Sequence, residues 1–239
     1  MKTILITGAA HGVGKEVAKI LKNNTLLLVD EDKKALEILG EELGAEIFVC
    51  DVSQSEQIEK TVKTIETSHK KIDCLVNCAA MWIAGEISNM SEASNKNMNK
   101  LDRVQKVIGT NVFGIVGMIS AVYPIMKKQG YGQIININSQ SGVEIEPMFP
   151  IYNATKHGAY AFRKAIQGDM AKHNIRITDI CPGLISTDFY KRAGKDLPQE
   201  LFDKCGLTAE EVAKTVKYVF ELPHEITIPS LEIRHIRNY

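Results

Sequence analysis

The chain has 239 residues and a mass of 26.5 kDa, the size of one ordinary domain with room for a substantial buried core. Apolar residues make up 44% and charged residues 24%, a composition that excludes wholesale disorder. The 29 basic and 29 acidic residues cancel, so the charge supports neither a nucleic-acid partner nor an anionic membrane surface. We therefore expect one domain, 1–239, that binds no nucleic acid and no membrane.

Short apolar, β-branched runs alternate with stretches of helical periodicity along the chain. The predicted strands are 3–7, 25–29, 46–50, 72–76, 132–138, 174–181 and 225–233. Most are apolar on both faces, as in a parallel sheet that helices cover on both sides. This order predicts an α/β fold, a Rossmann-like doubly wound parallel sheet of six to seven strands in a single domain.

The first strand runs directly into a glycine-rich turn at the start of a helix. Glycines there let the backbone approach a pyrophosphate, which the free N–H groups and the dipole of the helix N-terminus stabilise. The predicted phosphate contacts are Gly8, His11, Gly12, Val13 and Gly14. The second strand ends at Asp30, about twenty residues further on, where a carboxylate accepts the hydroxyls of the adenosine ribose.

An acid at position 30 predicts NAD as the cofactor, with NADP less favoured. A 2′-phosphate would bring roughly two negative charges against this carboxylate, each costing about 4 kcal/mol at about 4 Å and an effective dielectric near 20. Lys33 and Lys34 could compensate, but they begin the next helix and are expected to face solvent. No Lys or Arg directly follows Asp30 or occupies the turn before Gly14.

Tyr152 and Lys156 lie four residues apart, so a helix places them on the same face. A preceding predicted strand ends at Ser139, which puts its hydroxyl at the ligand-binding edge of the sheet. The ammonium is expected to lower the phenol pKa from its usual value of about 10. Such a tyrosine can exchange a proton with a substrate oxygen that the serine hydroxyl binds. This chemistry fits hydride transfer between a nicotinamide and an alcohol or carbonyl group.

Together and in order, the motifs of this chain resemble those of the short-chain dehydrogenase/reductase family in its compact form, over nearly the whole length. The motifs are the turn Thr7–Gly14, Asp30, Cys50-Asp51-Val52, Val76-Asn77-Cys78-Ala79-Ala80, Asn111, Ser139, Tyr152 with Lys156, and Pro182-Gly183 with Thr187. One departure is Ala80, which stands where the family usually has glycine. This exchange is small if the backbone there has no positive φ.

The resemblance implies a catalytic set of Asn111, Ser139, Tyr152 and Lys156. Tyr152 would be the proton donor or acceptor, and Ser139 would anchor the reacting oxygen. Lys156 would also bind the nicotinamide ribose, and Asn111 would hold a water that links Lys156 to solvent.

The resemblance also implies cofactor contacts beyond the glycine turn. Asp51 and Val52 would contact the adenine, Thr187 would bind the carboxamide of the nicotinamide, and Asn77 would mainly support the sheet. The full predicted cofactor-binding set is Gly8, His11, Gly12, Val13, Gly14, Asp30, Asp51, Val52, Asn77, Ala79, Tyr152, Lys156, Pro182, Gly183, Ile185 and Thr187.

Two irregular stretches follow strand ends, where open α/β sheets bind their ligands. We predict that 184–206 forms a lid over the substrate, whereas 81–99 is equally a pocket wall or a surface loop. The segment 81–103 is longer than is typical of the family, so the resemblance does not carry over a substrate. The apolar residues near these stretches predict a mostly apolar pocket: Trp82, Met148, Phe149, Pro150, Phe189, Tyr190 and Phe202.

The environment of the protein is predicted from its cysteines and its helices. The five cysteines show neither a disulfide pattern nor metal-site spacing, which favours buried thiols, no metal and a cytoplasmic location. The apolar run 115–126 is too short to span a bilayer. Family members pair through two long helices, here 102–127 and 151–172, which implies a homodimer or homotetramer. The apolar face Val112, Ile115, Ile119 and Val122 fits an interface or the core equally well.

Three functions compete for this pattern. The leading one is an NAD(P)-dependent oxidoreductase that acts on a small, mostly apolar alcohol or carbonyl substrate. The alternative from another class is a non-catalytic NAD-binding sensor that binds a partner protein, which would not need the catalytic set. A sugar-nucleotide epimerase or dehydratase of the related extended type is disfavoured, because few residues follow Thr187.

Overall fold

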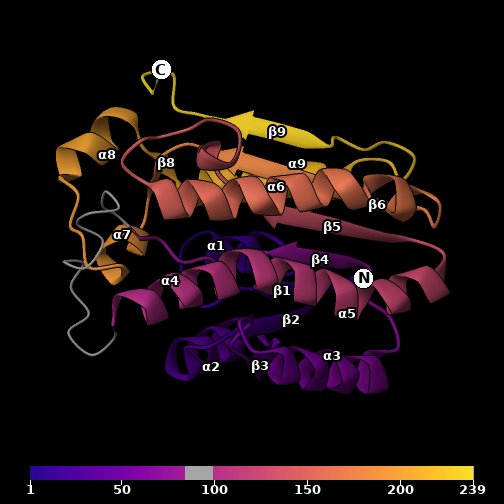
Figure 1. Cartoon of the computed structure of the whole chain (residues 1–239). Helices are drawn as coiled ribbons and strands as arrows, with labels where there is room; N and C mark the ends of the chain where they lie inside the picture. Colours follow the sequence, from indigo (N-terminus) through magenta and orange to yellow (C-terminus); the bar gives the residue numbers. More distant parts are fainter. Residues whose placement is uncertain (84–98, 239) are drawn as a thin grey trace.

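The computed structural model describes residues 1–83 and 99–238, and within them a parallel sheet lies between two layers of helices (Figure 1). The seven strands run in the order β3-β2-β1-β4-β5-β6-β9. They are β1 (Thr3–Thr7), β2 (Thr25–Asp30), β3 (Glu46–Val49), β4 (Cys74–Asn77), β5 (Gly132–Ile137), β6 (Ile175–Pro182) and β9 (Ser230–Ile233). The predicted doubly wound α/β sheet in a single domain is confirmed, with strand ends shifted by up to five residues from the predicted ones.

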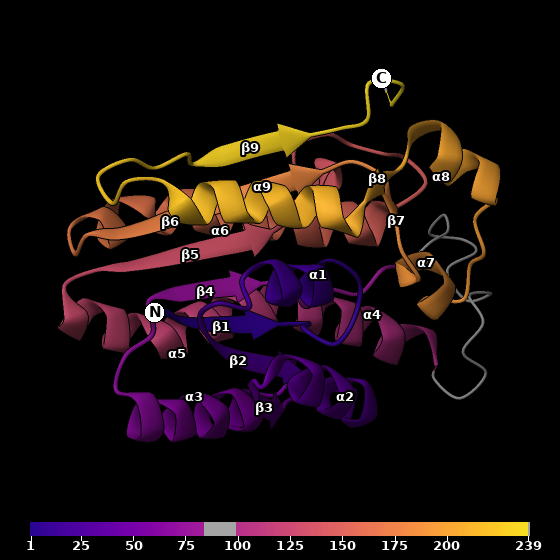
Figure 2. The same ribbon diagram turned by 180° about the vertical axis from the view of Figure 1, so that it is seen from behind.

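Alternate side chains of each strand enter two separate cores. In β1, Ile4 and Ile6 pack toward one helical layer, whereas Leu5 packs toward the other. The first layer consists of α1 (Gly12–Ile20), α2 (Lys33–Leu43) and α9 (Ala209–Glu221) (Figure 2). The second consists of α3 (Ser55–His69), α4 (Lys100–Ile108), α5 (Gly114–Gln129) and α6 (Pro150–Ala171) (Figure 1). Burial on both faces explains why these strands read as continuous apolar runs.

The chain changes direction across the sheet at β1, which pairs with β2 on one side and β4 on the other. Strands added after β3 continue from β4 toward β9, so the crevice beyond β1 and β4 is the topological switch point of the sheet. Open α/β sheets bind ligands at this point.

The predicted long helix 102–127 is found as α4 and α5, joined by a π-helical turn at Gly109–Phe113. The stretch Leu101–Gln129 is long and apolar enough to cross a membrane by length and composition alone. However, Ile115, Ile119 and Val122 pack against the sheet at 3% exposure or less, as in the core helix of a soluble protein. Three of the four residues of the apolar stripe noted in the sequence therefore face the core, whereas Val112 is only partly buried.

The segment 184–206 contains short elements that the sequence does not predict. Strand β7 (Ile185–Ser186) pairs with β8 (Leu207–Thr208), and helices α7 (Phe189–Arg192) and α8 (Gln199–Cys205) lie between them. The β7–β8 pair fixes both ends of the segment at the carboxyl edge of the sheet. Most of the other irregular stretch, 84–98, lies outside the described residues.

Candidate active site

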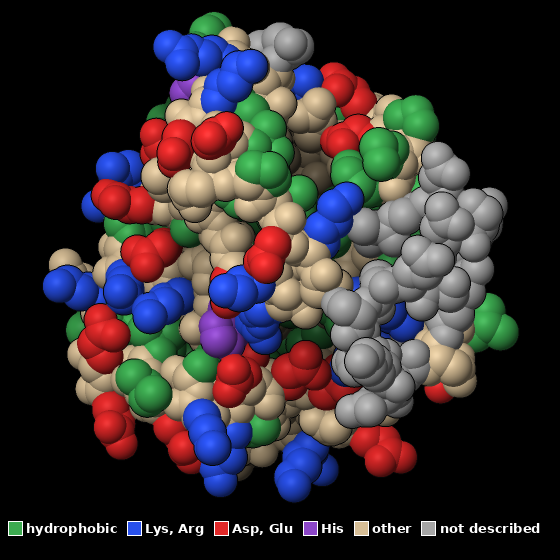
Figure 3. Space-filling view, turned by 90° about the vertical axis from the view of Figure 1, so that its left-hand side faces the viewer, with side chains coloured by type: hydrophobic (Ala, Val, Ile, Leu, Met, Phe, Trp, Pro, Cys, Tyr) green, Lys and Arg blue, Asp and Glu red, His purple; other side chains and the backbone are tan. Residues whose placement is uncertain are grey.

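A cavity of about 900 Å³ opens at the carboxyl edge of the sheet, the edge that faces the viewer in Figure 3. Its walls are the glycine turn, the residues that follow β2 to β6, and the segment 184–206. The predicted residues that line it are Gly8, His11, Gly12, Val13, Gly14, Asp30, Asp51, Val52, Ala79, Ser139, Tyr152, Lys156, Pro182, Gly183, Ile185 and Thr187. Asn77 and Asn111 are buried beside the cavity and do not line it.

The glycine turn has the backbone shape that a pyrophosphate requires. Gly8 has φ +64°, and a Cβ there would lie 2.6 Å from the backbone nitrogen of Ala79. A Cβ on Gly14 would lie 2.0 Å from the carbonyl oxygen of Gly8, so α1 can begin this close to β1 only with glycine. Gly12 (φ +47°) faces the cavity, with the Thr187 side chain 3.6 Å from the position of a Cβ. The glycines thus allow α1 to begin close to β1 beside the cavity, and phosphate binding there stays a prediction.

Asp30 is 8% exposed and ties the end of β2 to the glycine turn. Its Oδ2 accepts a hydrogen bond from the backbone N–H of Ala10 (3.0 Å), and its Oδ1 accepts one from that of Asp32 (2.9 Å). His11 Nε2 lies 2.8 Å from Asp32 Oδ2, and this hydrogen bond lowers the pKa of Asp32. The turn and the acid are thus held together at one end of the cavity.

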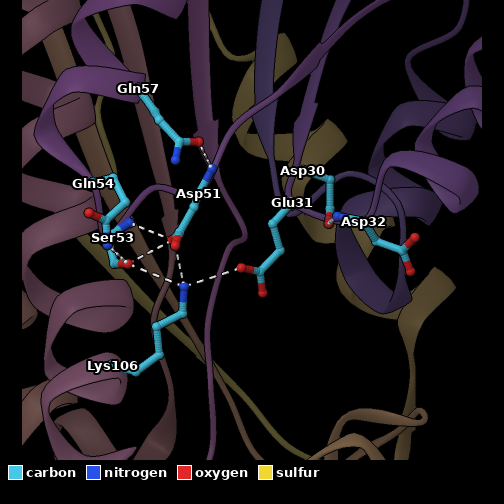
Figure 4. A network of polar contacts seen from close by, with 8 residues as sticks. All are labelled: Asp30, Glu31, Asp32, Asp51, Ser53, Gln54, Gln57 and Lys106. Carbon is cyan, nitrogen blue, oxygen red and sulfur yellow. Dashed lines mark hydrogen bonds and ion pairs between the residues drawn. The ribbon is translucent and has the colours of Figure 1, made fainter. Parts of the chain in front are cut away.

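A lysine that the sequence analysis missed reaches this end from α4. Lys106 Nζ donates to the carboxylate of Asp51, to Glu31 Oε2 (3.2 Å) and to Ser53 Oγ (3.2 Å) (Figure 4). Burial opposes the charge of Lys106, but the two carboxylates outweigh it and raise the lysine pKa. Because Lys106 lies 55 residues from Asp51 and 75 from Glu31, no local motif could reveal the contact.

Helix α6 presents the predicted catalytic pair from its first two turns, with Pro150 at its start. Tyr152 is 8% exposed and Lys156 only 1%. Lys156 Nζ donates to the carbonyl oxygen of Ile137 at the end of β5 (3.1 Å) and lies 5.7 Å from the centroid of the Tyr152 ring. The helix and the strand end together fix the ammonium beside the phenol.

The pKa of Tyr152 does not follow the expectation that Lys156 lowers it. Burial raises the pKa of Tyr152 above its usual value, Tyr190 and Glu146 raise it further, and Ser139 lowers it. Burial also lowers the pKa of Lys156 to about 8. The predicted lowering of the phenol pKa by Lys156 is therefore wrong for this chain, because the loss of solvent dominates both groups.

Ser139 lies two residues after the end of β5, in an extended conformation (φ −169°). Its Oγ accepts a hydrogen bond from the backbone N–H of Ser141 (3.1 Å) and interacts with the Tyr152 phenol. The two hydroxyls thus share one wall of the cavity, as the sequence predicts.

Asn111 lies in the π-helical turn and is completely buried. Its Oδ1 accepts from the backbone N–H of Met81 (2.7 Å), and its Nδ2 donates to the carbonyl oxygen of Met81 (2.8 Å) and to Thr155 Oγ1 (3.0 Å). Thr155, which the sequence analysis missed, in turn donates to the carbonyl oxygen of Tyr152 (2.8 Å). Asn111 therefore connects the residues after β4 to α6, and its water-holding role stays a prediction.

Asn77 supports the sheet beneath the cavity. Its Nδ2 donates to Asn136 Oδ1 (2.9 Å), and Asn136 donates to Asp179 Oδ1 (2.9 Å). Arg163 from α6 pairs with the other oxygen of Asp179 at 3.4 Å. Ala80 does not have a positive φ, so its replacement of the family's glycine causes no backbone strain.

An aromatic cluster forms the other end of the cavity. The Trp82 ring lies 5.2 Å from that of Phe149 and 5.0 Å from that of Tyr190, and Phe189 lies 6.4 Å from Tyr152. Trp82, Phe149, Phe189 and Tyr190 line the cavity, whereas Met148, Pro150 and Phe202 do not.

Charged residues that the sequence analysis did not assign to the site also line the cavity, among them Glu146, Arg103 and Lys195, whose Nζ lies 5.9 Å from the centroid of the Trp82 ring. Glu146 accepts a hydrogen bond from Ser141 Oγ (3.2 Å). Arg103 on α4 donates to the carbonyl oxygen of Ala193 in the segment 184–206 (2.7 Å).

Residues 2–198 match the family described as short chain dehydrogenase. The chain belongs to this family. An uncharacterised oxidoreductase of Staphylococcus saprophyticus is 28% identical over 98% of this chain and 95% of its own length. A serine dehydrogenase solved with NADP⁺ is 28% identical, with a TM-score of 0.87 over 98% of this chain and 95% of that one. A 3-ketoacyl-(acyl-carrier-protein) reductase from Brucella melitensis, solved with NADH, shares the fold at 22% identity, with a TM-score of 0.85 over 100% and 98% of the two chains.

Proposed function

We propose that this oxidoreductase transfers a hydride between NAD and the alcohol or carbonyl group of a small, mostly apolar substrate. The observation that carries the proposal is the position of the Ser139 and Tyr152 hydroxyls in one cavity, between the glycine turn and the aromatic cluster. A substrate oxygen bound to both hydroxyls would lie where the phosphate site and the apolar site meet.

The residues of this chain have distinct parts in the proposed chemistry. The nicotinamide, when bound, supplies or accepts the hydride. Tyr152 gives its proton to a carbonyl oxygen in reduction and takes it back from a hydroxyl in oxidation. Ser139 donates a hydrogen bond to the same oxygen, and Lys156 holds a positive charge close to the phenol. The raised pKa of Tyr152 keeps the phenol protonated, ready to donate.

NAD rather than NADP is the proposed cofactor. Asp30 and Glu31 both line the cavity at the end of β2, so a 2′-phosphate would meet two carboxylates there. The relative solved with NADP⁺ makes a direct test necessary. We expect kcat/KM to be at least about tenfold higher with NAD than with NADP, and Asp30→Ala to narrow the gap. Equal activity of the parent protein with both cofactors would refute this choice.

We further propose a cytoplasmic homodimer or homotetramer. All five cysteines are free, as suits a reducing compartment. Leu101, Ile108 and Phe113 on α4 and the π-helical turn are 75%, 46% and 41% exposed, so this helix offers apolar side chains to a second copy.

A panel of small alcohols with NAD, followed by the absorbance of NADH, separates this function from that of a non-catalytic sensor. The enzyme forms NADH with at least one alcohol, whereas a sensor binds NAD and forms none. Tyr152→Phe removes one hydroxyl and should lower turnover by a factor on the order of 10² or more with NAD affinity retained. Unchanged turnover in this variant would eliminate the proposed mechanism.

A further inference from the structure

The contacts of Lys106 at the adenosine end of the cavity satisfy its ammonium completely. Its three N–H groups have three acceptors, on Asp51 after β3, Glu31 after β2 and Ser53 (Figure 4). Helix α4 thus places the ammonium of Lys106 between the residues that follow β2 and β3, and these residues line the cavity.

The two carboxylate partners of Lys106 differ in how firmly they are held. Asp51 is 22% exposed, and its Oδ1 also accepts from the backbone N–H (2.9 Å) and the Oγ (2.7 Å) of Ser53. Glu31 is 53% exposed, and within the described part of the chain its carboxylate bonds to Lys106 alone. An exposed ion pair of this kind contributes little to stability. Glu31 is therefore the partner that another anion can replace.

The position of Glu31 indicates which anion that would be. It directly follows Asp30, whose carboxylate is bonded to the glycine turn at the proposed ribose site. A phosphate on the 2′-hydroxyl of that ribose would project from beside Asp30 toward its neighbour. Phosphate oxygens accept hydrogen bonds from an ammonium as carboxylate oxygens do.

We propose that Lys106 is a latent binding site for the 2′-phosphate of an adenosine, which Glu31 occupies in this protein. This inference rests on the proposed NAD-dependent function and explains the choice of cofactor, because the Glu31–Lys106 ion pair sets the preference for NAD over NADP. Two carboxylates, on Glu31 and Asp51, pair with one ammonium, so the net charge of the group is negative. The change Glu31→Gln removes one negative charge and leaves Lys106 beside a neutral amide oxygen, which a phosphate displaces more readily than a carboxylate.

Binding of adenosine fragments tests the proposal without any turnover. Calorimetry would compare 5′-AMP with adenosine 2′,5′-bisphosphate in the parent protein, Glu31→Gln, Lys106→Met and the double variant. We expect Glu31→Gln to tighten bisphosphate binding by at least about tenfold while AMP affinity stays within about threefold. In the double variant this gain should be lost, because the cation that receives the phosphate is gone.

Two controls separate the proposal from a general effect of charge or folding. Glu37→Gln on α2 removes a carboxylate that pairs with Lys33 (3.7 Å) away from the cavity, and should give no gain. Lys106→Gln keeps a hydrogen-bond donor and should fold if Lys106→Met does not. Combined with Glu31→Gln, it should also abolish the gain in bisphosphate affinity, because the positive charge is gone.

A gain that persists without Lys106, or no gain in Glu31→Gln, would overturn the proposal while AMP binding still supports the cofactor site. A parent protein that binds neither fragment would refute the proposed function together with this inference.

Discussion

The burial of Lys156 predicts a measurable dependence of stability on pH. Its side chain is 1% exposed, and burial lowers its pKa from 10.5 to about 8. Between these two values the unfolded chain holds a proton that the folded chain has released, so stability rises with pH there. This lowering of the Lys156 pKa from 10.5 to about 8 corresponds to about 3 kcal/mol over the whole window, and about 2 kcal/mol of this falls between about pH 7.5 and 9.5. The stability is fully present above pH 10.5 and is lost as the pH falls through 8.

Urea unfolding of the parent protein and of Lys156→Met at a series of pH values isolates this effect. Groups that do not interact with Lys156 titrate alike in both proteins and cancel in the difference between them. The stability of the parent relative to the Met variant should increase by about 2 kcal/mol from about pH 7.5 to 9.5. Lys164→Met, which changes an exposed lysine on the same helix, should run parallel to the parent. A constant difference between parent and Lys156→Met would show that Lys156 stays charged when folded, and the reasoning would fail.

Three further predictions concern the turn, the cavity and the assembly. Gly14→Ala would place a Cβ 2.0 Å from the Gly8 carbonyl oxygen and should lower both the melting temperature and the NAD affinity. Its control is Gly168→Ala, whose Cβ meets no atom within 4 Å and which should stabilise α6 by up to about 1 kcal/mol. Glu146→Gln removes a charge that raises the pKa of Tyr152. The increase of the alcohol oxidation rate with pH should therefore move to lower pH. An unchanged pH–rate profile would show that the charge of Glu146 does not act on the phenol. Sedimentation should show a dimer or tetramer, which Phe113→Asp on the exposed π-helical turn should dissociate; a monomeric parent would refute the assembly.

The sequence predicted those parts of the molecule that depend on local patterns. Strand β1 has the predicted limits because its five apolar and β-branched residues stand between a polar start and the glycine turn. Tyr152 and Lys156 were placed on one helical face by their spacing, and Ser139 by its position after a strand. The fold follows from the same patterns, since alternating strands and helices leave few arrangements of a parallel sheet.

The contacts that the sequence could not predict join residues far apart in the chain. Lys106 reads as one charge on a helix surface, and only the packing of α4 against the ends of β2 and β3 gives it Glu31 and Asp51 as partners. The pKa of Tyr152 was expected to fall because a neighbouring charge is visible in the sequence. Burial, which dominates, is a property of the whole fold. The elements of 184–206 were missed because two-residue strands carry no periodicity.

The helical run from α4 to the π-helical turn bonds to three separate segments around the cavity. Lys106 bonds to Asp51 after β3, Arg103 bonds to Ala193 in the segment 184–206, and Asn111 bonds to Thr155 on α6. The π-helical turn contains Asn111, whose side chain is fully buried, and such turns often occur at functional sites. Because this run bonds to the residues after β2 and β3, to the segment 184–206 and to α6, we expect a change in its position to alter cofactor affinity and turnover together. Substitutions on this run should therefore be judged by both quantities, and not by the loss of activity alone.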